Sequence, residues 1–154
     1  MSNYIMEEIQ SFVQLNNFIS NLSDEQKADS VIAAKCANKF LELFQVLLNS
    51  KVRPENDGLT QNQQDLDKRK EESIKANECY NKIKVLPLPN SFREDFLKLQ
   101  SQVDEICKIS SATAGLNTRM NEILNEANLK SKQNQGCMVV IALFIISTVC
   151  LFLI

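Results

Sequence analysis

The chain has 154 residues, with 17 Lys and Arg against 19 Asp and Glu, and so a formal net charge of −2. This balance gives no basis for nucleic-acid binding, which favours clustered positive charge. The chain has no histidine, the commonest general base and metal ligand, and it has no glycine-rich phosphate loop, G-x-S-x-G or C-x-x-C motif. We therefore expect no catalytic residues, no metal site, no cofactor and no small-molecule substrate.

The first 86 residues are predicted to form an N-terminal helical region of three helices within an all-α fold. The first helix is expected over residues 3–22, where apolar side chains recur at helical spacing. Ser23 and Gln26 then form a capping box that begins the second helix. Pro54 ends that helix. Three of its apolar side chains are expected in an internal core, namely Phe40, Phe44 and Leu47.

The third helix is expected over residues 61–86, behind a second capping box formed by Thr60 and Gln63. Its first half is very polar. Asp65 lies four residues before Arg69, a spacing that favours an ion pair on one helix face. The run of basic residues at 68–70 is flanked by acids, so we interpret it as part of a solvated surface.

A long coiled-coil-like helix is predicted over residues 90–131. Pro87 and Pro89 separate it from the preceding helix, and Ser91 and Glu94 form a capping box at its start. Five apolar residues step by four and three, the spacing of a coiled-coil seam. They are the predicted partner-binding residues, and the alternative is that they pack within the chain: Phe92, Phe96, Leu99, Val103 and Ile106.

The chain ends in an apolar segment, residues 137–154, that follows a juxtamembrane tether at 132–136. The segment has no charged residue and no proline. As a helix, its roughly 18 residues would cover about 27 Å, close to the thickness of a bilayer core. We therefore predict one C-terminal transmembrane helix. The alternative, a buried core helix, would need equally apolar surroundings, which the polar remainder does not supply.

The position of this segment predicts the topology of a tail-anchored protein. Insertion is expected to follow release from the ribosome, and the N-terminus lacks the basic and apolar regions of a secretory signal. Lys130 and Lys132 before the span favour a cytosolic N-terminal domain. A short span suits the thinner endoplasmic reticulum or early Golgi membrane. Cys137 lies at the predicted membrane face, where it is a candidate for S-palmitoylation or an ordinary boundary residue.

The succession of helix, tether and terminal anchor over residues 91–154 resembles the layout of SNARE membrane-fusion proteins. That resemblance implies helical protein partners and a role in vesicle fusion. The seam departs from the SNARE pattern because its middle positions carry Ser, Thr or Asn, and Gln102 lies off the seam. The leading hypothesis is a tail-anchored helical adaptor or tether that recruits cytosolic protein partners to an internal membrane. A divergent SNARE-like subunit is the alternative.

Overall fold

The described elements of this computed structural model are all helices. The backbone is described for residues 6–56 and 58–152, and the side chains for 6–56 and 58–130. The helices are α2 (Phe12–Ser20), α3 (Asp24–Lys27), α4 (Ser30–Asn49), α5 (Gln63–Ile83), α6 (Asn90–Lys98) and α7 (Gln100–Phe152). The chain divides into two compact units, which we call unit 1 (Met1–Gly115) and unit 2 (Leu116–Ile154).

The predicted membrane anchor, residues 137–154, lies outside the residues whose side chains are described. Among the residues that are described in full, no helix is both long enough and apolar enough to cross a membrane. The backbone of α7 is helical through residues 132–136, where the tether was expected.

Polar side chains at the helix starts explain where α2, α3 and α4 begin. The Ser11 hydroxyl accepts a hydrogen bond from the Gln14 amide, so α2 begins at Phe12, later than expected. The capping box of Ser23 and Gln26 is confirmed, but it opens only the four-residue helix α3. The longer helix α4 starts after Asp29, whose carboxylate accepts from the Val31 amide at 2.7 Å.

The other two predicted capping boxes are wrong. Thr60 lies in the turn before α5. The Asn62 amide donates to the Arg53 carbonyl at 2.7 Å, so the segments before and after this turn are hydrogen-bonded to each other. Asn62 therefore caps α5, accepting from the Asp65 amide at 3.1 Å. Helix α6 begins directly after Pro89, so Ser91 already lies in its first turn and no side chain caps it.

The predicted long helix is divided at Leu99 into α6 and α7. The Tyr80 hydroxyl lies 3.3 Å from the carbonyl oxygen of Phe96 and 3.1 Å from that of Leu97. The Leu99 amide also donates to the Phe96 carbonyl, at 3.2 Å, and a carbonyl at a helix end can accept from a further donor because the next turn no longer supplies one. The Tyr80 hydroxyl therefore stabilises the division between the two helices.

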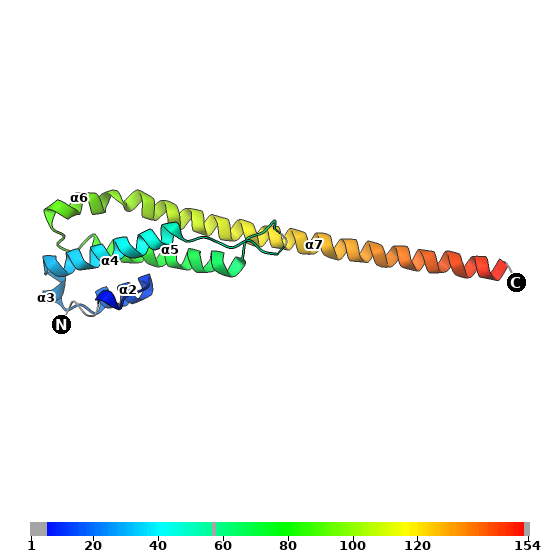
Figure 1. The fold of residues 1–154 in the computed structure, drawn as a ribbon, viewed down its shortest axis with the longest axis horizontal. Helices are drawn as coiled ribbons and strands as arrows, with labels where there is room; N and C mark the ends of the chain where they lie inside the picture. The colour runs from blue at the N-terminus through cyan, green and yellow to red at the C-terminus, as the bar shows by residue number, and fades with distance from the viewer. Residues whose placement is uncertain (1–5, 57, 153–154) are drawn as a thin grey trace. The chain divides into compact units, whose positions relative to one another are not determined.

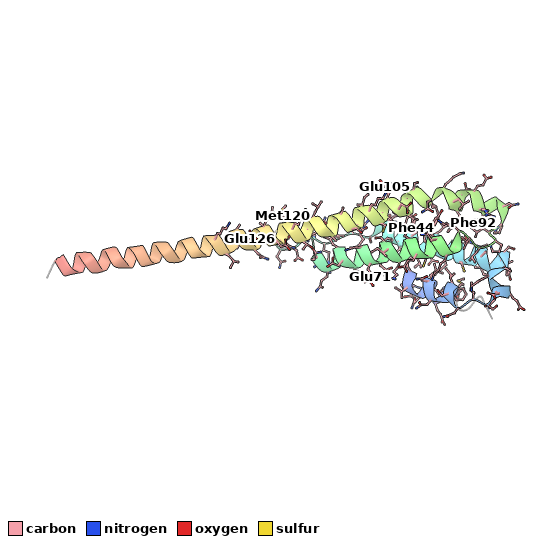
Figure 2. The ribbon with its side chains drawn as sticks, turned by 180° about the vertical axis from the view of Figure 1, so that it is seen from behind. Phe44, Glu71, Phe92, Glu105, Met120 and Glu126 are labelled. Carbon is pink, nitrogen blue, oxygen red and sulfur yellow. The ribbon has the colours of Figure 1, made fainter. Side chains whose placement is uncertain are left out.

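The core of unit 1 is built around one aromatic side chain, Phe40. Helices α2, α4 and α5 pack against one another (Figure 1). Phe40 is fully buried, and four rings surround it with centroids at 5.5–5.9 Å: Phe12, Phe44, Tyr80 and Phe96. These distances are typical of favourable aromatic pairs. The predicted core positions Phe40, Phe44 and Leu47 are confirmed, and Figure 2 labels Phe44 among the packed side chains.

Two buried thiols make the stability of unit 1 depend on pH. Burial raises the pKa of Cys36 to about 11 and that of Cys79 to about 12, from an ordinary value of 9.0. Above pH 9 the unfolded chain loses these protons while the folded chain keeps them. The free energy of unfolding should therefore fall as the pH rises from 9 towards 11–12. Each thiol contributes a decrease of at most about 1.4 kcal/mol for each pH unit.

Urea unfolding, followed by circular dichroism at several pH values, measures this loss. The control is a Cys36→Ala/Cys79→Ala variant, which should have a flatter pH dependence above pH 9. Equal pH profiles for the two proteins would contradict the assignment to these thiols.

Candidate functional site

The predicted partner-binding residues lie in or against the core of unit 1. Phe96, Val103 and Ile106 are buried there, while Phe92 and Leu99 are partly buried and pack against the same cluster. Figure 2 labels Phe92 on α6. Phe96 stacks on Tyr80 with a centroid distance of 5.1 Å. All five side chains therefore pack together in or against the core of their own chain. Packing within the chain was the alternative to partner binding in the sequence analysis.

A different apolar strip is exposed further along α7, in unit 2. We call it the α7 stripe: Leu116, Met120, Ile123 and Ala127. The exposed fractions of the first three side chains are 66%, 47% and 62%, and Ala127 is also exposed. Steps of four, three and four residues place them on one side of a helix. Figure 2 shows Met120 and Glu126 on this part of α7.

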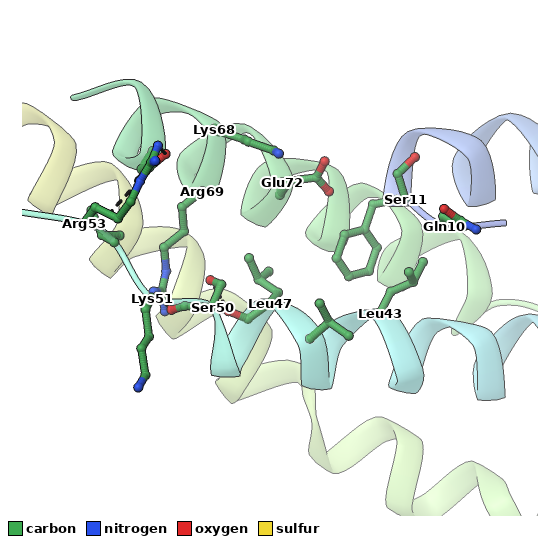
Figure 3. Close-up of a pocket in the computed structure, with 14 residues that line it drawn as sticks. Gln10, Ser11, Leu43, Leu47, Ser50, Lys51, Arg53, Lys68, Arg69 and Glu72 are labelled. Carbon is green, nitrogen blue, oxygen red and sulfur yellow. Dashed lines mark hydrogen bonds and ion pairs between the residues drawn. The ribbon is translucent and has the colours of Figure 1, made fainter. Parts of the chain in front are cut away.

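A groove of about 560 Å³ opens between α2, α4, α5 and residues 50–53 (Figure 3). We call it the unit 1 groove. Its apolar wall comes from the start of α2 and the end of α4, through Phe12, Leu43, Val46 and Leu47. Val46 is 66% exposed, whereas the other three are buried at the base. The charged wall comes from the segment after α4 and from α5, through Lys51, Arg53, Asp65, Lys68, Arg69 and Glu72.

The predicted ion pair between Asp65 and Arg69 is wrong. Asp65 instead receives two hydrogen bonds from the Arg53 guanidinium, at 2.9 and 3.1 Å. The hydrogen bonds from Arg53 lower the pKa of Asp65, and those to Asp65 raise the pKa of Arg53. Arg69 donates to the Ser50 carbonyl oxygen at 2.7 Å, at the end of α4. These contacts fix one end of the groove.

Cys137, the candidate lipidation residue, lies outside the residues whose side chains are described. Cys36 and Cys79 are free and buried, and Cys107 is free and partly buried. Within the described residues, no group of three His, Cys, Asp or Glu side chains could hold a metal ion.

Comparisons with protein-family models, with curated proteins and with solved structures find no match. Any proposal for the function of this chain therefore depends on its own sequence and on two surfaces, the α7 stripe and the unit 1 groove. Sequence reasoning missed the unit 1 groove because it joins residues up to 62 positions apart. The one available signal was the basic run at 68–70, whose first two members line the groove.

Proposed function

We propose that the chain is a tail-anchored helical adaptor or tether, which recruits protein partners to an internal membrane through helix contacts. The apolar sequence of residues 137–154 supports the anchor. Its short length and the lysines before it support a single span in the endoplasmic reticulum or Golgi membrane, with the N-terminal region cytosolic.

The observation that carries the recruiting role is the exposed α7 stripe. Single exposed apolar side chains are common, but three large ones aligned on one side of a helix, as in Leu116, Met120 and Ile123, are a mark of an interaction surface. Arg119 and Glu126 lie seven residues apart at one edge of the stripe. In coiled coils such flanking charges form interhelical ion pairs and select the partner. A partner helix would therefore cover the stripe and place opposite charges beside these two residues.

We expect Ile123→Asp in the full chain to weaken recruitment strongly. A carboxylate in the middle of an apolar helix interface loses its hydration and leaves a poorly packed contact. Proximity labelling from the N-terminus in cells should show stripe-dependent neighbours reduced about tenfold or more, which corresponds to about 1.4 kcal/mol or more of binding free energy.

The matched control is Asn125→Asp, which adds the same charge at an exposed position on the other side of the helix. It should leave the neighbours unchanged, and both variants should stay in the membrane fraction. A neighbour set that survives Ile123→Asp, or is lost equally in the control, would refute recruitment through the stripe.

A SNARE-like subunit is the second candidate, and the length of α7 favours it. The helix backbone continues from residue 100 to residue 152, as the layout of fusion proteins would require. The α7 stripe has coiled-coil spacing, but it contains no Gln or Arg. Mixing the protein with SNARE proteins distinguishes the two candidates. A tight, detergent-resistant four-helix complex would support the fusion role, and its absence beside stable capture of other proteins would support the adaptor.

A further inference from the structure

We propose that the unit 1 groove is a peptide-binding site, for a short partner segment in which apolar side chains stand next to carboxylates. The proposal concerns residues 10–72 of unit 1. It does not depend on the α7 stripe or on the membrane anchor, and its tests use different substitutions.

The shape of the groove suits two or three side chains of an extended segment. Its volume of about 560 Å³ lies within the range of ordinary ligand sites. Figure 3 shows Leu43 and Leu47 of α4 pointing towards α5, with Lys68 and Glu72 on the opposite side. Val46 adds the most exposed apolar side chain of the wall. A peptide could therefore place apolar side chains against α4 while its polar groups meet α5.

The charges of the groove select an acidic partner. Four basic and two acidic residues line it, although the chain as a whole is slightly negative. Asp65 is engaged by Arg53, so Glu72 is the acid that remains to oppose Lys51, Lys68 and Arg69. Arg69 uses one nitrogen for the Ser50 carbonyl, and its guanidinium carries further N–H donors. A carboxylate near Lys68 and Arg69 would form charge-assisted hydrogen bonds.

Hydrogen-bonding groups at both ends favour a peptide over an acyl chain. Gln10 and Ser11 line one end and Ser50 the other, with the apolar wall between them. The backbone of an extended peptide carries a donor and an acceptor in each residue, and these need partners on binding. An acyl chain has no such groups and would favour a closed apolar tunnel, whereas this groove is open to solvent.

The test uses the full chain and three acetylated, amidated hexapeptides. Each peptide carries two leucines followed by two glutamates, two glutamines or two lysines, between terminal glycines. Methyl NMR signals of Leu43, Val46 and Leu47 report occupation of the groove. We expect the glutamate peptide to shift these signals, the glutamine peptide to bind about threefold to tenfold more weakly, and the lysine peptide not to bind.

Two pairs of variants test whether peptide affinity depends on residues of the groove. In each pair, one substitution lies in the groove and the other lies outside it on the same helix. Lys68→Glu should weaken the glutamate peptide about tenfold, because it replaces an attraction by a repulsion, while Lys70→Glu on the same helix should change affinity less than about twofold. Lys70 is exposed and does not line the groove. Val46→Gln should weaken all binding, whereas Val31→Gln, at another exposed valine of α4, should not.

Several results would overturn the proposal. One is a lysine peptide that binds as tightly as the glutamate peptide. Another is an equal loss of affinity for the glutamate peptide in Lys68→Glu and Lys70→Glu. A third is the absence of any methyl shift with any peptide up to about millimolar concentration. Dodecanoate is the remaining probe. If it shifts the three methyl signals and the glutamate peptide does not, the groove is a lipid site and the peptide proposal is wrong.

Discussion

Replacing Phe40 by alanine should unfold most of the population of unit 1 under mild denaturing conditions. The side chain is fully buried, and its ring lies within 5.5–5.9 Å of four other rings, measured between centroids. Loss of a buried phenylalanine removes its burial energy and leaves a cavity, which together cost about 3–5 kcal/mol. The total stability of a small domain is about 5–15 kcal/mol, so this loss is a large part of it.

Urea unfolding of the full chain, followed by circular dichroism, measures the effect. Val31→Ala is the matched control, because Val31 lies on the same helix and is 59% exposed. The control should lower the free energy of unfolding by no more than about 0.5 kcal/mol. Similar losses for the two variants would show that Phe40 does not hold the core together.

Ending the chain after Gln135 should move the protein from the membrane fraction to the supernatant. The deletion removes residues 136–154, in which Leu, Ile, Phe and Val predominate. Each such residue favours membrane insertion by about 0.3–0.6 kcal/mol at the centre of a helix, so we expect the whole segment to supply the energy of the proposed anchor. Carbonate extraction of membranes, followed by immunoblotting, measures the distribution.

A second variant keeps the length of the chain and changes only its hydrophobicity. Leu143→Arg/Ile146→Arg places two charges in the predicted span, each costing about 2.5–3.5 kcal/mol, and should reduce insertion in the same way. Both changed proteins should keep the helical circular dichroism of helices α2 to α6. Carbonate removal of the unaltered chain, or membrane retention of the shortened one, would refute the anchor and with it the recruiting role.

Local signals predicted the helices well where neighbouring residues decide the structure. The capping box of Ser23 and Gln26 forms because both partners lie within one turn. The core positions of α4 followed from helical periodicity, which places Phe40, Phe44 and Leu47 on one face. The all-helical fold of the described residues followed from the scarcity of glycine and proline.

Contacts between distant segments explain the errors. Asp65 pairs with Arg53 and not with Arg69, because the turn before α5 brings Arg53 beside the start of that helix. At the division at Leu99, the Tyr80 hydroxyl of another helix donates to the carbonyls of Phe96 and Leu97, a contact that the local sequence does not reveal. The five apolar residues around Phe96 and Val103 had the spacing of a partner seam, but periodicity does not distinguish a partner from the chain's own core.

The aromatic core has a practical consequence for spectroscopy. The chain contains no tryptophan and two tyrosines, Tyr4 and Tyr80. Tyr80 is fully buried and stacks on Phe96. Substituting Tyr4 by phenylalanine would leave Tyr80 as the single tyrosine, where α5 packs against α6. Its emission would then report the integrity of that junction in real time, without any attached dye.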